Sequence, residues 1–224
     1  MNLTAEAKRA VGFAAVDRFV RDGTCIGLGT GTTAYWAVLR AGELVAGGWK
    51  LRAVATSLAT ERQCAQLGIP LVELGAEPID VALDGADEAA PDHSLIKGGG
   101  GALFREKAVA LAARTFIAIV TERKLVPRLG TCPLPVEVVP FSLRYVTTEI
   151  TALGAGVAVR THDGAHYVTD NGNAVLDCAF GEIGDPKALD ARLRELHGVV
   201  GTGLFVDIAA HVLVGHPSGA VSES

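Results

Sequence analysis

The chain has 224 residues, of which 49% are hydrophobic and 20% are charged, and its formal net charge is −5. These fractions are typical of a globular protein and exclude a disordered or collagen-like chain. A small negative charge without a block of like charges argues against nucleic acid or an anionic membrane as the main partner. The 27 glycines indicate tight turns, or a backbone that closely approaches a ligand.

The sequence predicts neither a membrane span nor disulfide bonds. Charged residues interrupt the two longest apolar tracts, 110–120 and 199–215, so neither is a candidate span. The first residues lack a basic segment followed by an apolar one, and we therefore expect no secretory signal and a cytoplasmic location. The cysteines have no C-x-x-C spacing, which favours buried reduced thiols. They are Cys25, Cys64, Cys132 and Cys178.

Short apolar runs alternate with helical stretches through the first 120 residues. This alternation predicts parallel strands joined by crossover helices, with ligands bound at the carboxyl ends of the strands. The expected strands are 24–28, 51–56, 79–83 and 115–120, and the expected helices are 4–20, 32–46, 57–67 and 102–113.

The pattern changes after Cys132. Strands are expected at 134–139, 157–160 and 199–205, helices at 143–153 and after the N-cap Asp185, and a hairpin over 166–179 that turns at 170–173. This order predicts a small ferredoxin-like α+β domain. The last apolar segment, 208–215, is expected to return to the first sheet. We therefore expect an α/β fold, with a Rossmann-like parallel sheet and flanking helices over 1–130 plus 206–224 and an inserted α+β domain over 131–205.

A glycine-rich turn, Gly27-Leu28-Gly29-Thr30-Gly31-Thr32-Thr33-Ala34, joins the first expected strand to a helix. Its N–H groups and hydroxyls are suited to an anion at the positive end of the helix. The next strand ends in Ala55-Thr56-Ser57 instead of an acidic residue, which argues against a dinucleotide. The turn is not a P-loop either, because it does not end in a Lys-Ser or Lys-Thr pair. A tight turn without a ligand is the alternative.

Three carboxylates follow the expected strand at 79–83, in Asp84-Gly85-Ala86-Asp87-Glu88. Acidic groups directly after a buried strand are costly unless they are used or satisfied. Asp84 and Asp87 are candidates for a metal pair, a proton-transfer pair or acceptors for sugar hydroxyls. The alternative is a capping cluster.

Four consecutive glycines, Gly98 to Gly101, follow Lys97 and precede Glu106. Such a run is expensive in chain entropy, which indicates a backbone conformation or a close approach that side chains would prevent. In isolation, Arg105-Glu106-Lys107 is typical of a solvated helix face. None of the six histidines belongs to a pattern that would make it the base instead.

Taken together and in this order, the three loops resemble those of the type A ribose-5-phosphate isomerase family. Further similarity comes from Leu134-Pro135-Val136-Glu137-Val138, Thr169-Asp170-Asn171-Gly172-Asn173 and Gly203-Leu204-Phe205. The resemblance spans nearly the whole chain. Thr32 stands where serine is common in the family and Gly101 where alanine is frequent, and a hydroxyl is thus retained at position 32.

The resemblance implies interconversion of ribose 5-phosphate and ribulose 5-phosphate through an enediolate, in the pentose phosphate pathway, by a homodimer or homotetramer without a metal or organic cofactor. It makes Glu106 the general base, places Lys97 at the developing oxyanion, and assigns Asp84 and Asp87 to the sugar hydroxyls. On sequence alone, the two lysines that it assigns to the phosphate are typical surface residues. The implied substrate contacts are Lys8, Thr30, Gly31, Thr32, Thr33, Gly85, Ala86, Gly98, Gly99, Gly100 and Lys124.

Two alternatives remain open at this point. A CoA-transferase-like enzyme would use Glu106 as a covalent nucleophile. A non-catalytic sugar-phosphate-binding module would bind the same ligand without turnover, and the lack of a basic helix-turn-helix in the sequence weighs against it.

Overall fold

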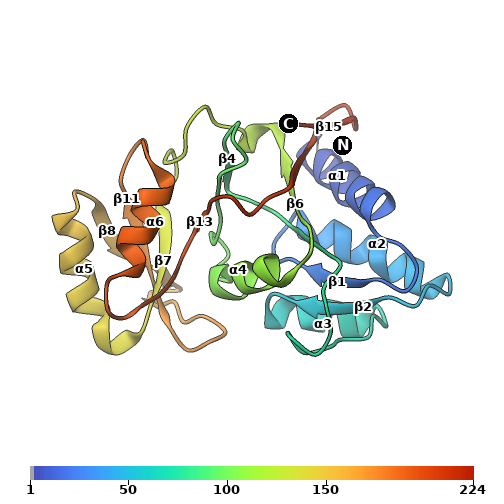
Figure 1. Cartoon of the computed structure of the whole chain (residues 1–224), viewed down its shortest axis with the longest axis horizontal. Coiled ribbons are helices and arrows are strands. Elements are labelled where there is room, and N and C mark those ends of the chain that lie inside the picture. The colour runs from blue at the N-terminus through green and yellow to red at the C-terminus, as the bar shows by residue number, and fades with distance from the viewer. Residues whose placement is uncertain (1–2) are drawn as a thin grey trace. The chain divides into compact units, whose positions relative to one another are not determined.

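The computed structural model describes residues 3–224, which form two compact units (Figure 1). Unit 1 comprises Met1–Ala86, Arg105–Leu125 and Ile208–Ser224, and unit 2 comprises Asp87–Phe104 and Val126–Asp207. The segment Asp87–Phe104, which we expected in the larger domain, groups with unit 2. The reason is strand pairing, because β5 (Leu95–Ile96) lies between β4 (Glu88–Ala89) and β13 (Leu204–Phe205) in a three-stranded antiparallel sheet.

Unit 1 contains a six-stranded sheet in the order β15-β14-β6-β3-β1-β2. All neighbours are parallel except the edge strand β15, which is antiparallel to β14. The expected parallel sheet and the return of the last apolar segment to it are both confirmed. The strands are β1 (Cys25–Leu28), β2 (Arg52–Ala55), β3 (Val81–Asp84), β6 (Phe116–Thr121), β14 (His211–Gly215) and β15 (Val221–Glu223).

Side chains alternate between the two faces of this sheet. The helices of unit 1 are α1 (Leu3–Phe19), α2 (Ala34–Ala46), α3 (Leu58–Gln66) and α4 (Leu103–Ala112), which starts in unit 2. Helices α1 and α2 pack on one face, and α4 packs on the other. Ile26 and Leu83 belong to a buried cluster with residues of α1 and α2. Gly27 faces the other way, where an added Cβ would lie 2.5 Å from Val109 Cγ1 of α4. Small residues therefore let α4 lie close to the sheet.

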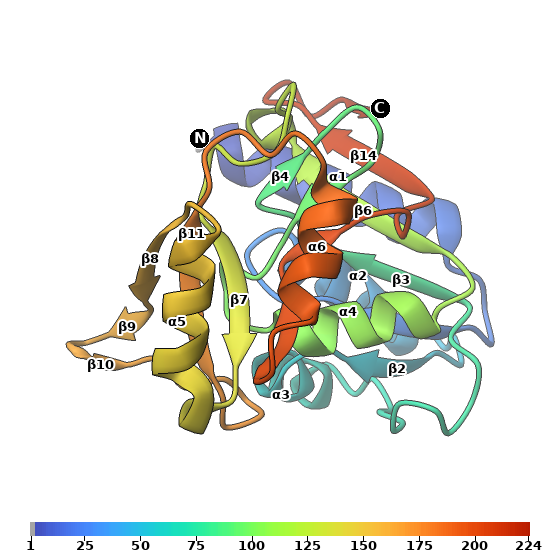
Figure 2. The same ribbon diagram turned by 60° about the vertical axis from the view of Figure 1, so that its left-hand side comes forward.

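Unit 2 contains a four-stranded antiparallel sheet in the order β12-β7-β11-β8 (Figure 2). With its two helices, this is the expected ferredoxin-like arrangement. Val136 and Val138 pack with residues of both helices, whereas Pro135 and Glu137 face the opposite side of the sheet. The elements are β7 (Leu134–Val138), α5 (Leu143–Ala152), β8 (Gly156–Val159), β11 (Ala174–Ala179), α6 (Pro186–Arg194) and β12 (Val199–Thr202).

The expected hairpin over 166–179 is only partly present. In the described chain β11 pairs with β7 and β8, and a separate hairpin joins β9 (Thr161–His162) to β10 (Ala165–His166). The turn after Thr169 does form, because Gly172 N–H donates to Thr169 O. Buried Glu137 holds this turn by accepting hydrogen bonds from Thr169, Asn171 and Asn173. Side-chain bonds to a carboxylate thus replace the expected strand pairing.

The single strand expected over 199–205 divides at Gly203. β12 joins the four-stranded sheet and β13 pairs with β5. At Gly203 an added Cβ would lie 2.3 Å from Lys97 O, so only glycine allows this close approach. The remaining elements are the 3-10 helices η1 (Glu122–Lys124) and η2 (Pro140–Ser142).

All four cysteines are free thiols, and three of them are buried as expected, whereas Cys132 is half-buried. Burial raises the pKa of Cys64 to about 11 and that of Cys178 to about 12, so both are neutral near pH 7. Among residues 3–224, no helix has the length and apolar character needed to cross a membrane.

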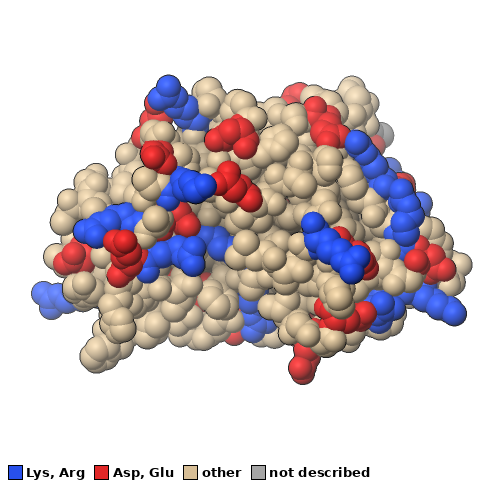
Figure 3. Space-filling view, in the orientation of Figure 1, with Lys and Arg blue, Asp and Glu red and all other residues tan. Residues whose placement is uncertain are grey.

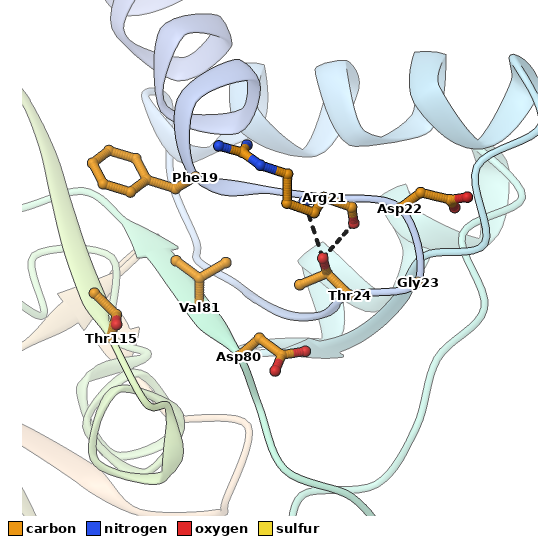
Figure 4. A pocket seen from close by; sticks show the side chains of 8 residues that line it. All are labelled: Phe19, Arg21, Asp22, Gly23, Thr24, Asp80, Val81 and Thr115. Atoms are coloured by element: carbon orange, nitrogen blue, oxygen red, sulfur yellow. Dashed lines mark hydrogen bonds between the residues drawn. The ribbon is translucent and has the colours of Figure 1, made fainter.

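One pocket of unit 1, of about 370 Å³, lies at the amino-terminal edge of the sheet (Figure 4). Hydrogen bonds between Thr24 and the backbone of Arg21 close the turn that precedes β1 there. None of the predicted site residues lines this pocket. Its lining consists of Phe19, Arg21, Asp22, Gly23, Thr24, Asp80, Val81 and Thr115.

Candidate active site

In unit 1, several predicted site residues lie at the carboxyl-terminal edge of the parallel sheet, where two further hydroxyl residues join them. The glycine-rich turn follows β1, Thr56 and Ser57 follow β2, Gly85 follows β3, and η1 with Lys124 follows β6. This edge is where open α/β sheets bind their ligands.

Asp84 is the last residue of β3 and is 3% exposed. Its Oδ1 accepts hydrogen bonds from the N–H groups of Thr30, at 3.1 Å, and Gly85, at 2.7 Å. An added Cβ on Gly29 would lie 2.0 Å from the same oxygen. The glycine-rich turn therefore folds over Asp84, and its N–H groups stabilise the charged carboxylate.

The hydroxyl of Thr30 lies in a cluster with three other hydroxyls. Its Oγ1 is 2.7 Å from Thr56 Oγ1, 2.8 Å from Ser57 Oγ and 3.1 Å from Thr60 Oγ1. Thr60 Oγ1 in turn donates to Gly29 O at 2.9 Å. The cluster fixes the turn through the side chain of Thr30. The sequence did not predict this structural role of Thr30, although the hydroxyls of Thr56 and Ser57 at a strand end were a sign of it.

Lys8 of α1 donates from Nζ to Thr32 Oγ1 at 2.8 Å. This contact places an ammonium group and a hydroxyl at the start of α2, where Thr33 is the N-cap residue. A positive charge, a hydroxyl and a helix N-terminus together make a site suited to phosphate. Lys124 is half-buried in η1, at the same edge of the sheet.

Glu106 lies in the first turn of α4 and is 5% exposed. Its neighbour Arg105 pairs with Glu61 across 3.5 Å. In isolation, Arg105-Glu106-Lys107 indicated a solvated helix face. For Glu106 this prediction is wrong, because its side chain is buried. A carboxylate this deeply buried is costly to keep charged unless its surroundings or its chemistry require it.

In unit 2, Asp87 and the glycine loop Gly98–Gly101 are joined directly. Asp87 Oδ2 accepts a hydrogen bond of 2.7 Å from Gly99 N–H, and Asp87 N–H donates to Ile96 O, also at 2.7 Å. Lys97, which opens the loop, is 2% exposed. Its Nζ lies 5.4 Å from the centroid of the Phe205 ring, within the range of a cation–π contact.

Three of the four consecutive glycines have an identifiable steric reason. Gly98 and Gly101 have φ of 97° and 81°, values that disfavour residues with a side chain. At Gly99 an added Cβ would lie 2.8 Å from Asp87 Oδ1. Gly100 has open space around it and is exposed to solvent. The glycines thus cost chain entropy, but they permit a tight loop whose backbone contacts a carboxylate.

Glu88, the third carboxylate of the acidic segment, has a different environment. It is 3% exposed and accepts hydrogen bonds from the N–H groups of Gly130, at 2.7 Å, and Cys132, at 2.5 Å. The capping interpretation therefore holds for Glu88, which fixes the segment before β7.

The predicted residues divide between the two units. Thr30 to Thr33, Gly85, Ala86 and Glu106 belong to unit 1, with Lys8, Asp84 and Lys124, whereas Asp87, Lys97 and Gly98 to Gly100 belong to unit 2. The chain passes between the units at Ala86–Asp87 and again at Phe104–Arg105. Both passages lie within the segments that carry candidate catalytic residues. Among residues 3–224 there is no group of three or more His, Cys, Asp or Glu placed to hold a metal ion.

The chain is similar to known proteins over most or all of its length. The family described as ribose 5-phosphate isomerase A (phosphoriboisomerase A) matches residues 52–219. Ribose-5-phosphate isomerase A of Bacillus mycoides is 44% identical over 203 residues, which are 90% of this chain and 92% of the relative. That of Methanothermobacter thermautotrophicus is 44% identical over 98% of both chains. A solved D-ribose-5-phosphate isomerase in complex with phospho-erythronic acid has a TM-score of 0.95 at 36% identity, covering 100% of this chain and 99% of its own.

Proposed function

Because the chain belongs to the ribose 5-phosphate isomerase A family, its reaction is the interconversion of D-ribose 5-phosphate and D-ribulose 5-phosphate, and we propose that the residues described above carry it out. The observation that carries the assignment of roles is the burial of Glu106 at the start of α4. The family match favours the isomerase over the two alternatives left open by the sequence.

The reaction moves one proton between neighbouring carbons. A base removes the proton from C2 of the open-chain aldose, the C–H electron pair forms a C1–C2 double bond, and the carbonyl pair moves onto O1. The enediolate then takes a proton at C1 while the electron pair on O2 re-forms a carbonyl at C2. The enzyme must therefore supply a base, stabilise an oxyanion and exchange protons between O1 and O2.

Glu106 is the base in this proposal. A positioned carboxylate that takes the proton from C2 and returns it to C1 accelerates such reactions by about 10²- to 10⁴-fold. Its buried position keeps water from competing for the proton while it is held on the carboxyl group.

Lys97 and the N–H groups of the glycine loop stabilise the negative charge that develops on the substrate oxygens. Lys97 is buried and its cation is held beside Phe205, so its position is set before the substrate binds. Preorganised donors of this kind contribute about 3 kcal/mol each to the stability of the transition state.

Asp84 and Asp87 accept the sugar hydroxyls, assist ring opening and transfer protons between oxygens. Each uses one carboxylate oxygen to accept backbone N–H bonds, Asp84 Oδ1 and Asp87 Oδ2. Those bonds orient the carboxylates, which supports a role toward hydroxyl groups of the substrate.

The phosphate is bound at the start of α2 by Thr32, Thr33 and Lys8, together with Lys124. The hydrogen bond between Lys8 and Thr32 supports this part of the proposal. The phospho-erythronic acid bound by the solved relative carries a phosphate group, as ribose 5-phosphate does, and a carboxylate that resembles an enediolate. We therefore assign a phosphosugar to this edge of the sheet.

We also propose a cytoplasmic homodimer or homotetramer. The four free thiols suit a reducing compartment. Phe141, at 98% exposure, and Tyr145 offer apolar surface for a subunit contact. Acidic and basic side chains are interspersed on the face shown in Figure 3, which supports a small-molecule substrate in preference to nucleic acid.

Glu106→Gln tests the role of the base. In a coupled assay with ribose 5-phosphate, we expect turnover to fall by about 10³-fold while phosphosugar affinity stays within a few-fold, because the amide keeps the shape but takes no proton. Glu61→Gln, which changes the half-buried partner of Arg105, is the matched control and should retain full turnover. Near-normal turnover in Glu106→Gln would refute the assignment.

A further inference from the structure

Two side chains of unit 2 hold the carbonyl oxygens of the glycine loop, and neither is among the residues that the family resemblance assigns. Arg160 Nη1 donates to Gly98 O at 2.8 Å and to Gly99 O at 3.1 Å. The hydroxyl of Tyr167 donates to Gly100 O at 3.2 Å. We call Arg160 and Tyr167 the carbonyl clamp. It fastens three successive peptide groups of the loop.

The clamp is itself held rigidly. Arg160 follows β8, and its N–H donates to Val175 O of β11 at 2.8 Å. Its guanidinium group bonds both carboxylate oxygens of Asp177, with Nε 3.0 Å from Oδ2, and its side chain is only 14% exposed. The guanidinium carbon lies 5.9 Å from the centroid of the Tyr167 ring. A bidentate pair of this kind fixes the direction of the remaining Arg160 donors.

Tyr167 also packs against the end of the loop. An added Cβ on Gly101 would lie 2.2 Å from the Tyr167 hydroxyl oxygen, so the loop backbone sits directly on the ring. On its other side, Gly98 packs beside Pro135, on the face of the four-stranded sheet opposite α5 and α6. The loop is therefore supported by the sheet of unit 2 as well as by the clamp.

The carbonyl contacts determine where the loop's N–H groups point. In a planar trans peptide, the C=O and the following N–H point in opposite directions. Because Arg160 holds the carbonyls of Gly98 and Gly99, the N–H groups of Gly99 and Gly100 point away from it. The Gly99 N–H does reach Asp87 Oδ2, at 2.7 Å.

We propose that Arg160, supported by Asp177 and Tyr167, is a positioning residue for the isomerisation, which directs the N–H groups of Gly99 and Gly100 toward Asp87 and the developing oxyanion. The inference rests on the oxyanion role proposed for the loop. Arg160 touches no reacting atom in this scheme. It acts through the backbone of Gly98 and Gly99, which have no side chains of their own to hold them in place.

Arg160→Gln tests the clamp by separating transition-state binding from substrate binding. We expect kcat to fall about 10- to 100-fold while KM for ribose 5-phosphate changes less than about 3-fold, since the loop binds charge that develops only during the reaction. Affinity for phospho-erythronic acid should fall with kcat. Arg160→Lys, which keeps one cationic donor, should recover part of the loss.

Arg128→Gln is the matched control, because Arg128 pairs with Glu182 where both side chains are more than 60% exposed. Its kcat and KM should equal those of the parent chain.

Tyr167→Phe removes only a hydroxyl and provides the test if Arg160→Gln does not fold. We expect its kcat to fall by about 3- to 10-fold. An inactive parent chain would refute the proposed function. An active parent with folded clamp variants of unchanged kcat, or with only KM raised, would overturn the clamp.

Discussion

Lys8 and Thr32 are 24 positions apart and are joined by a hydrogen bond of 2.8 Å at the start of α2. The ammonium group approaches the end of the helix that carries partial positive charge. A cation in this position is unfavourable unless an anion binds beside it, and the proposed anion is the substrate phosphate. This pairing makes Lys8 the residue through which phosphate binding is most directly tested.

Lys8→Met should raise KM for ribose 5-phosphate by about 10-fold or more and leave kcat within about 3-fold, because a charge-assisted contact to phosphate contributes to substrate and transition state alike. The measurement is steady-state kinetics of the isomerase reaction. Lys187→Met, which removes an exposed lysine paired with Asp207, is the control. A fall in kcat at unchanged KM would contradict the phosphate role.

At the scale of single residues, chemistry was easier to predict than surroundings. The sequence indicated Asp84, Asp87 and Glu88 as one acidic cluster, and only the backbone donors around each separate their environments. Lys8 gave no local signal, because its partner lies on another element. Arg160 was missed for the same reason: its targets are carbonyl oxygens, which no sequence pattern distinguishes.

Among the elements, helix α6 begins where the sequence predicts it. Asp185 accepts a hydrogen bond from Ala188 N–H at 2.9 Å, and Pro186 occupies the first turn. Both features were predicted from the residue types. The helix buries Leu193 against the four-stranded sheet of unit 2.

Asp185→Ala should lower the free energy of unfolding by about 1 kcal/mol, because the N-terminal N–H of α6 loses its acceptor. Urea denaturation measures the change. Asp185→Asn keeps an acceptor and should lose less. Equal stability of the alanine and asparagine variants would show that the cap contributes nothing, and isomerase activity at 25 °C should be the same in all three proteins.

Strand assignments were reliable where burial alone sets the pattern and failed where side chains decide the pairing. The parallel strands of unit 1 are apolar on both faces and were predicted closely. The hairpin arm before residue 170 was predicted from its turn, yet buried Glu137 holds that turn instead of a partner strand. The strand over 199–205 was predicted as one element, because a steric limit at Gly203 depends on a distant carbonyl.

For the whole molecule, we predict that the proposed chemistry does not depend on a metal ion. Asp84 Oδ1 accepts hydrogen bonds from two backbone N–H groups and Asp87 Oδ2 from one, which leaves these two oxygens less available to a metal ion. In the described part of the chain, His, Cys, Asp and Glu nowhere gather in threes around a possible ion.

Treatment with EDTA should leave isomerase activity unchanged. The measurement is the initial rate with ribose 5-phosphate before and after chelation, with a non-chelating buffer exchange as the control. Activity that is lost to EDTA and restored by magnesium would make Asp84 and Asp87 metal ligands and would contradict their assignment to hydroxyl groups.

The division of the chain limits how it can be cut. A shortened protein that lacks 131–205, removed as if it were an inserted cassette, would leave β5 without β13, its neighbour in the three-stranded sheet. It would also lose Arg160 and Tyr167 while retaining the glycine loop that they hold. Chimaeras between relatives should therefore exchange 87–104 together with 126–207. These two stretches form one compact unit, although the 21 residues of Arg105–Leu125, which belong to unit 1, separate them in the sequence.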